Sequence, residues 1–162
     1  KASNAAPVSK KIQEDMFNLV CDGMSEGVVT DTIMTYVNCI KNSELPIDDI
    51  CLSTRLGMHL SEYKTLSGGS KAAHYYNKHL QSGEPFSKGD SVKWTYVSGV
   101  PSTMPPTQVV GFREESELEG FTIDTDTIIE KMVKKKIEST FSVLDWNINN
   151  AIGGARPKNY GW

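Results

Sequence analysis

The sequence predicts an α+β fold that is mostly α-helical, with a small antiparallel β-subdomain inserted before the last long helix. Three observations lead to this prediction. Apolar residues recur at helical spacing within the first 42 residues and again within residues 126–146. Between these stretches, residues 91–97 alternate in the pattern of a half-buried strand. A chain with 38% hydrophobic and 23% charged residues also has the composition of a globular protein.

Two helices are expected at the start of the chain. Pro7 suits the first position of a helix, and Gly23 ends it. The second helix is expected from about Ser25 to Asn42, because the following Leu45-Pro46 step disfavours helical backbone. The apolar stripes are Val8, Ile12, Met16, Leu19 and Val20 in the first helix, and Val29, Ile33, Val37 and Ile40 in the second.

Short strands and helices are predicted in the middle of the chain. Residues 50–56 have the pattern of a strand, and a helical turn is expected at residues 59–63. The SGGS segment at 67–70 is interpreted as a flexible hinge that leads into a helix from Ser70 to about Leu80, because glycine allows backbone angles that other residues avoid. A turn at residues 85–90 precedes two strands, SVKWTYVSG and TQVVGF, which a loop at 101–106 joins.

One long helix is predicted in the last third of the chain. The acidic segment REESELEG is interpreted as a linker to a helix from about Asp126 to Trp146. Residues 147–162 are expected to form a flexible C-terminal tail. The buried side of the long helix is predicted to consist of Ile128, Ile129, Met132, Val133, Ile137, Phe141 and Leu144.

The formal net charge is −3, but the charges are unevenly distributed. Residues 55–96 carry six basic and three acidic side chains, and residues 131–162 carry six and two. Residues 111–130, between these blocks, carry one basic and seven acidic side chains. Nucleic-acid binding requires a local positive surface rather than a basic average. The two basic blocks are therefore compatible with one positive face.

Two groups of lysines could form that face. Lys71, His74 and Lys78 are spaced to lie on one side of a helix, and so are Lys131, Lys134 and Lys135, with Lys136 turned aside. Lysines on helix faces suit phosphate contacts that do not depend on sequence. The alternative is an ordinary solvated surface.

Tyr63-Lys64, just before the glycines, is a candidate contact for the sugar–phosphate backbone, because tyrosine combines an apolar ring with a polar tip. The alternative for Tyr63 is a place in the core. In IDTDTII, Asp124 and Asp126 resemble a catalytic metal-binding pair, but the second aspartate opens a helical pattern, where it suits a cap. No catalytic residues and no metal site are therefore assigned. A small metal-dependent nuclease built on this pair is kept as a rival function.

The cysteines and the apolar segments limit the class of protein. Cys21, Cys39 and Cys51 form no C-x-x-C pair, which predicts buried, reduced thiols rather than zinc ligands or a disulfide framework. No apolar run approaches the roughly 20 residues of a membrane helix, and no secretory signal opens the sequence. These features predict a cytoplasmic protein without a membrane partner.

Taken in order, several segments resemble one family. These are KASNAAPVSKKIQ, LPIDDICLSTRLGMHLSEYK, SKAAHYYNKHL, FSKGDSVKWTYV and GFTIDTDTIIEKMVKKKIESTFSVLDW. They are similar to the C-terminal part of family B DNA polymerases, from the end of the palm through the thumb. AAHYYNKHL and GFTID…EKMVKKKIE resemble the phage or viral branch, which implies the host cytoplasm as the location.

The resemblance implies three regions. Residues 1–46 would be palm-end helices that pack on a catalytic core absent from this sequence, residues 47–146 the thumb domain, and residues 147–162 the tail. The thumb would grip primer–template duplex DNA and support processive replication. The family's catalytic aspartates and fingers helix are not here, so catalysis and its magnesium would belong to the absent palm, and this chain would hold no cofactor.

The resemblance also implies site residues and partners. Tyr63, Lys71, Lys131 and Lys135 match positions that approach the DNA. Lys64, Lys78, Lys88, Lys93 and Lys134 extend this set by charge and proximity. Partners would be the palm, fingers and exonuclease part of the polymerase and a sliding clamp, although the NYGW ending departs from the usual clamp-binding pattern. The alternative is a small subunit of a split polymerase that acts mainly as a protein-interaction module.

Overall fold

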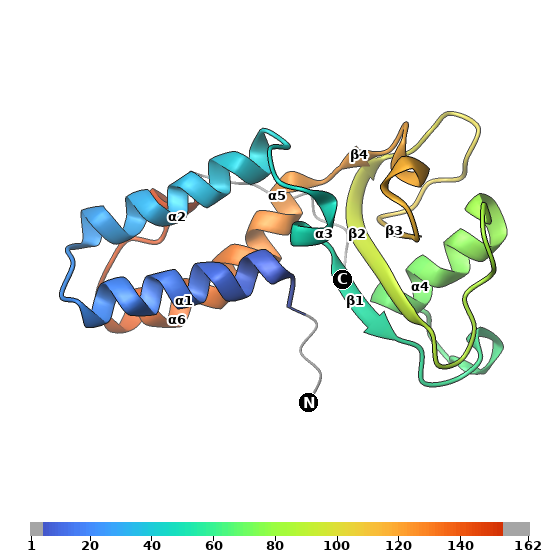
Figure 1. Ribbon diagram of the computed structural model, residues 1–162, viewed down its shortest axis with the longest axis horizontal. Coiled ribbons are helices and arrows are strands. Elements are labelled where there is room, and N and C mark those ends of the chain that lie inside the picture. Colours follow the sequence, from blue (N-terminus) through green and yellow to red (C-terminus); the bar gives the residue numbers. More distant parts are fainter. Residues whose placement is uncertain (1–4, 154–162) are drawn as a thin grey trace. The chain divides into compact units, whose positions relative to one another are not determined.

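A computed structural model describes residues 5–153, which form two compact units. The sheet unit comprises residues 51–124. The helical unit comprises residues 5–50 together with the segment that begins at residue 125. Figure 1 shows the strands of the first and the long helices of the second. The sheet unit is therefore one continuous segment, whereas the helical unit is built from both ends of the described chain.

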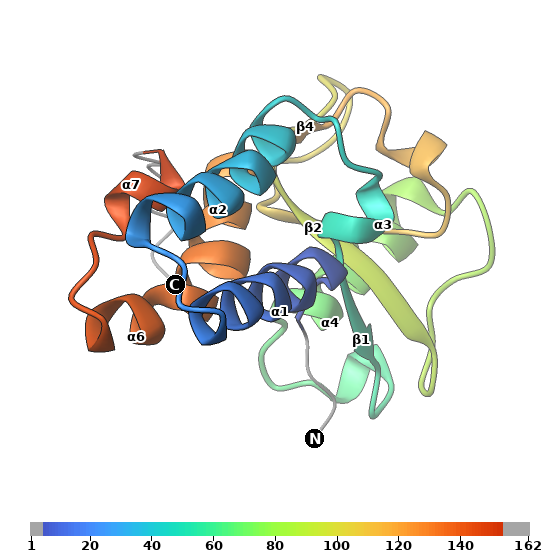
Figure 2. The same ribbon diagram turned by 60° about the vertical axis from the view of Figure 1, so that its left-hand side comes forward.

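Within the described residues, the helical unit contains seven helical segments. Ser25 caps the second helix, because its side-chain oxygen accepts a hydrogen bond from the Val28 N–H at 3.4 Å. Helix α1 packs against α2 and α6, and these lie side by side in Figures 1 and 2. The segments are α1 (Pro7–Cys21), α2 (Glu26–Lys41), α3 (Ile47–Ile50), α5 (Thr125–Ile128), the π-helix η4 (Ile129–Lys134), α6 (Lys135–Val143) and α7 (Asn149–Ile152).

Two hydrogen bonds join α1 to the C-terminal helices. The buried Ser9 Oγ donates to the Met132 carbonyl at 2.5 Å, and the Gln13 Nε2 donates to the Lys136 carbonyl at 3.0 Å. Ser9 and Gln13 are four residues apart, and so are their acceptors. One face of α1 therefore lies along η4 and the start of α6. The expected division at residue 46 is thus not the division between the compact units. Packing of α1 and α2 on a further catalytic core stays a prediction.

The sheet unit is organised around its longest strand. β2 (Ser91–Gly99) pairs antiparallel with β1 (Leu52–Arg55), β3 (Val109–Phe112) and β4 (Thr122–Ile123). Trp94 is opposite Leu52 in β1 and opposite Gly111 in β3. This antiparallel sheet and the helices of both units confirm the predicted α+β, mostly helical fold class.

Helix α4 (Gly68–Tyr75) packs on the face of the sheet that carries Trp94. A Cβ atom at Gly111 would lie 2.9 Å from the Ala72 carbonyl oxygen, so the helix backbone approaches the strand closely there. Ala72 and Ala73 are fully buried at this contact. Small residues on both elements allow this close packing. The π-helix η2 (Tyr76–Leu80) continues α4.

The two glycines that open α4 are packed, which corrects their interpretation as a flexible hinge. The helix begins at Gly68 rather than Ser70, and Gly68 has a φ of +51°. A Cβ at Gly69 would lie 2.5 Å from the Thr54 Cβ, and one at Gly68 would lie 3.3 Å from the Trp94 ring. Thr54 of β1 therefore leaves no room for a side chain at residue 69. At residue 68 the positive φ favours glycine, and a Cβ would also lie close to the Trp94 ring.

Other elements also differ from the predictions. The strand expected at 50–56 begins after the short helix α3, and the acidic linker contains the 3₁₀ helix η3 (Glu115–Leu118). The last long helix is interrupted by η4 and ends at Val143. Part of the expected tail is folded, since α7 buries Ala151 and Ile152 and contacts α2. The rest of that tail, residues 154–162, lies outside the described residues.

The thiols differ in exposure. Cys51 is buried as predicted, Cys39 is half-buried, and Cys21 is exposed, so the prediction of three buried thiols is wrong for Cys21. Burial and the neighbouring Glu44 raise the pKa of Cys39. Within residues 5–153 no helix is long and apolar enough to cross a membrane.

Candidate nucleic-acid interface

The structure places the predicted site residues in both units. Lys131, Lys134 and Lys135 belong to the helical unit. Tyr63, Lys64, Lys71, Lys78, Lys88 and Lys93 belong to the sheet unit. The expectation that both lysine-bearing helices line one wall stays a prediction, and each group is described within its own unit.

The first basic group lies on α4 and η2. Alanine and tyrosine residues of these helices face the core, whereas Lys71 and His74 are half-buried and Lys78 is exposed. Burial lowers the pKa of His74, and the positive charges of Lys78 and His79 lower it further. His74 and Lys78 are thus close neighbours, and Lys71 precedes them on the same, more exposed side of the segment.

Lys64 and Lys88 lie in loops of the sheet unit, and both are exposed. Lys88 is at the tip of the predicted turn, where the Asp90 carboxylate accepts from the Ser87 N–H at 2.9 Å. Gly89, with a φ of +91°, supplies the left-handed residue that this turn requires. The turn therefore presents Lys88 to solvent.

Lys93 is placed differently from the other lysines of the sheet unit. It precedes Trp94 in β2, so it points to the face opposite the one that α4 covers. Its Nζ atom lies 5.3 Å from the centroid of the Phe112 ring, a cation–π distance. Lys93 and Lys71 therefore belong to opposite faces of the sheet and do not form one surface.

The second basic group lies on η4 and α6. Burial lowers the pKa of Lys131, and nearby Lys135 lowers it further, while Glu130 opposes both effects. The Lys134 Nζ lies 3.6 Å from the Glu130 carboxylate, an ion pair at i,i+4 spacing. Lys135 is exposed. The charge of Lys134 is therefore partly compensated within the helical unit.

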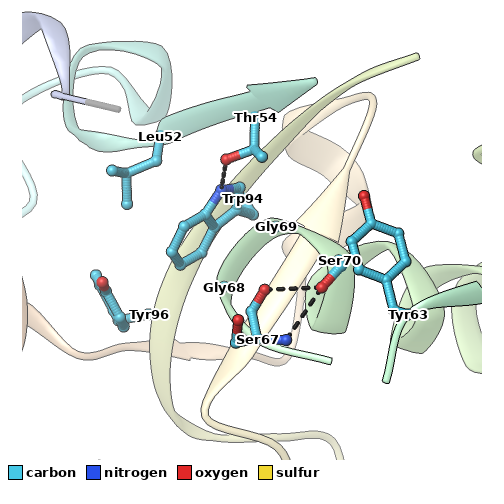
Figure 3. Close-up of a pocket in the computed structure, with 9 residues that line it drawn as sticks. All are labelled: Leu52, Thr54, Tyr63, Ser67, Gly68, Gly69, Ser70, Trp94 and Tyr96. Carbon is cyan, nitrogen blue, oxygen red and sulfur yellow. Dashed lines mark hydrogen bonds between the residues drawn. The ribbon is translucent and has the colours of Figure 1, made fainter. Parts of the chain in front are cut away.

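Tyr63 lines a pocket of about 440 Å³ in the sheet unit. Figure 3 shows Trp94 between Thr54 and the turn at Gly68, with Tyr96 and Tyr63 on opposite sides. We call this cavity the Trp94 pocket. It was not predicted, because its walls come from segments far apart in the sequence. They are Leu52, Thr54, Tyr63, Ser67, Gly68, Gly69, Ser70, Trp94 and Tyr96.

The two aspartates of IDTDTII lie at the junction of strand β4 and helix α5. The buried Asp124 follows β4, and its N–H donates to the Tyr96 carbonyl at 3.0 Å. Asp126 is in the first turn of α5, where a negative charge suits the helix dipole. Among residues 5–153, no three His, Cys, Asp or Glu side chains are grouped so that they could hold a metal ion.

Sequence comparison identifies no relative: no protein-family model matches this chain, and no curated protein matches it. A solved structure is similar in fold. The family B DNA polymerase from the hyperthermophilic archaeon Pyrobaculum calidifontis gives a TM-score of 0.63 at 22% sequence identity. The similarity covers 83% of this chain and 17% of that chain.

At 22% sequence identity, the similarity establishes the fold alone. The chain has the mixed helix-and-sheet fold of one region of a family B DNA polymerase, and it spans about 17% of the length of that protein. This agrees with the family indicated by the sequence segments. The similar structure is archaeal, so it gives no support to the expected phage or viral branch.

Proposed function

We propose that this chain is the thumb region of a family B DNA-directed DNA polymerase. In this role it grips primer–template duplex DNA through sequence-independent phosphate contacts and so supports processive replication. The observation that carries the proposal is the fold similarity over 83% of the chain. The agreement between that fold and the order of the sequence segments adds independent support.

The chain works with other parts of the polymerase in this proposal. The catalytic carboxylates and their magnesium ions belong to the palm, which together with the fingers and exonuclease domains is the protein partner. A sliding clamp is a further proposed partner, although the NYGW ending lies outside the described residues. The cytoplasm is the proposed location.

A salt titration tests the proposal. The affinity for a blunt duplex, measured by fluorescence anisotropy, should fall linearly with ionic strength on a double-logarithmic plot. The slope gives the number of phosphates neutralised, since each contributes about −0.9. With four to eight contacts, as roughly expected for such lysines, the slope is about −4 to −7. A duplex affinity that does not change with salt would refute the proposal.

Single lysine variants locate the contacts. Lys71→Ala and Lys135→Ala should each reduce the magnitude of the salt slope by about one and weaken binding equally for all sequences. Lys10→Ala is the matched control, because Lys10 is also an exposed lysine on a helix but belongs to residues 1–54, which carry four basic and eight acidic side chains. An equal effect of Lys10→Ala would indicate general charge attraction rather than a defined interface.

A second candidate function is an interaction module of a split polymerase. It is favoured by the exposed apolar side chains of Phe17, Met24 and Val28, which are 49%, 43% and 43% exposed around the α1–α2 connection. Exposed apolar side chains that gather on a surface are typical of protein contacts. This function would be favoured if the Phe17→Ser variant no longer captured the catalytic fragment while its duplex binding was unchanged.

A further inference from the structure

Three helices meet at one end of the helical unit. The two hydrogen bonds that join α1 to η4 and α6 both link residues 123 positions apart, so α1 and α6 run parallel. Val20 is therefore level with Val143, and the two helices end together. The Asn147 N–H donates to the Glu26 carboxylate at 3.5 Å, which places the start of α2 at the same end. Figures 1 and 2 show the end of α6 beside the turn that joins α1 to α2.

This end of the helical unit exposes apolar side chains. Val143 closes α6 and is 85% exposed, and Phe17, Met24 and Val28 belong to the end of α1, the connecting turn and the start of α2. Within residues 5–153, these four are the large apolar side chains that are exposed. Exposed apolar residues that gather in one place, rather than singly over the surface, are typical of protein contacts. We call these four residues the apolar end.

The surroundings of the apolar end carry negative charge. Residues 12–40 and 137–153 contain no lysine or arginine, and they contain seven acidic residues: Glu14, Asp15, Asp22, Glu26, Asp31, Glu138 and Asp145. Neither α1 nor α6 has a basic residue in its last turn, so the negative ends of both helix dipoles add to these carboxylates. Helix α2 begins here with the opposite dipole, but its first turn carries an acidic residue. The apolar end is therefore surrounded by uncompensated negative charge.

This combination determines which partner fits. Covering exposed apolar side chains is favourable, and the carboxylates around them favour a partner that brings positive charge. The same carboxylates repel the phosphates of a nucleic acid and the headgroups of an anionic membrane. A protein segment with apolar side chains flanked by lysine or arginine satisfies both conditions.

We propose that the apolar end docks a basic amphipathic segment of a partner protein. The apolar side chains of that segment cover the apolar end, and its basic side chains pair with Asp22 and Asp145, which are both exposed. The proposal supplies a chemistry for the protein partner of the second candidate function, and only that link rests on that function. It does not depend on duplex binding.

Synthetic peptides test the chemistry of the partner. A fluorescently labelled peptide of leucines and lysines, spaced as an amphipathic helix, is titrated with the full chain and followed by anisotropy without DNA. It should bind, and its affinity should fall as salt is added. Two matched peptides should not bind: one with glutamate in place of lysine, and one with serine in place of leucine. Equal binding of either matched peptide, or no binding of the leucine–lysine peptide, would overturn the proposal, whatever the result with duplex DNA or the catalytic fragment.

Surface variants locate the contact. Val143→Ser should weaken peptide binding by roughly tenfold, because it removes an apolar side chain that the peptide covers. Asp22→Asn combined with Asp145→Asn should weaken it by roughly threefold to tenfold, the size of two exposed ion pairs. Asp145 has a φ of +57°, a conformation that asparagine also adopts readily, so this variant should fold.

The matched control removes the same charge elsewhere. Glu115→Gln combined with Glu119→Gln changes two exposed carboxylates of the sheet unit and should leave peptide binding unchanged. Equal weakening by this control would indicate general charge attraction and overturn the proposal. A concentration-dependent dimer in sedimentation velocity that Val143→Ser abolishes would assign the surface to a second copy instead. Tighter peptide binding after Arg156→Gln and Lys158→Gln would assign it to basic residues of this chain.

Discussion

Replacing Gly69 by alanine tests whether the turn at the start of α4 is a packed joint or a hinge. The new Cβ would lie 2.5 Å from the Thr54 Cβ and 2.9 Å from its Cγ2 and Oγ1. Unstrained carbon contacts are about 3.5–4.0 Å, so β1 and α4 must separate by roughly 1 Å. Such overpacking typically costs about 1–3 kcal/mol.

A smaller effect opposes this cost. Alanine is about 0.5–1 kcal/mol more favourable than glycine within a helix. The net expectation for Gly69→Ala is therefore a loss of ~1–2 kcal/mol in the free energy of unfolding. A urea titration followed by far-ultraviolet circular dichroism measures it through the unfolding midpoint, provided that the slope with denaturant is unchanged.

Gly27→Ala is the matched control for this measurement. Gly27 is also in the first turn of a helix, α2, but the nearest atom to its added Cβ is the Ser25 Oγ at 3.9 Å. The control should be neutral or more stable by up to about 1 kcal/mol. If Gly69→Ala behaves like Gly27→Ala, the packing argument is wrong, and a flexible turn would again be the better description.

Three further predictions concern individual contacts. Ser9→Ala should lower the free energy of unfolding by ~1–3 kcal/mol, because it leaves the Met132 carbonyl without its buried donor; an unchanged urea midpoint would contradict this. Burial and a 2.5 Å hydrogen bond to a carboxylate on α1 raise the pKa of Tyr36 to about 12. Stability linked to this phenol should thus be present below about pH 10 and lost as the pH rises towards 12, and Tyr36→Phe should remove the last step of an absorbance titration. Lys78→Gln should raise the pKa of His74, measured by NMR titration of its ring protons, since it removes a neighbouring positive charge; a fall would contradict the placement of these side chains.

The elements best predicted from sequence are those whose pattern is local. The stripes of α1 and α2 and the alternation around Trp94 correctly located two helices and the central strand. The N-terminal signals Pro7 and Ser25 also fell within a residue of the observed helix starts. Such signals depend only on neighbouring residues, so they can be recognised without knowledge of the rest of the fold.

The features that were missed depend on distant partners. Gly69 was taken for a flexible residue, because its true constraint, Thr54, comes from another strand. The Trp94 pocket combines segments between residues 52 and 96, and among its walls only Tyr63 was predicted as a site residue. Lys93 was grouped with the other lysines by charge, although the alternation of β2 alone could have placed it on the opposite face from Trp94.

The π-helices η2 and η4 both occur within lysine-bearing segments of the chain. A π turn closes its hydrogen bond with one residue more than an α turn, so each segment contains, in effect, one surplus residue. Deleting a single residue there, such as Lys134 in η4, would leave an ordinary α turn and keep the following Ile137 and Phe141 directed at the core. The same deletion inside α6 would rotate everything after it by about 100°, as the geometry of 3.6 residues per turn requires. These two segments are therefore places where the chain can change its length without losing its register.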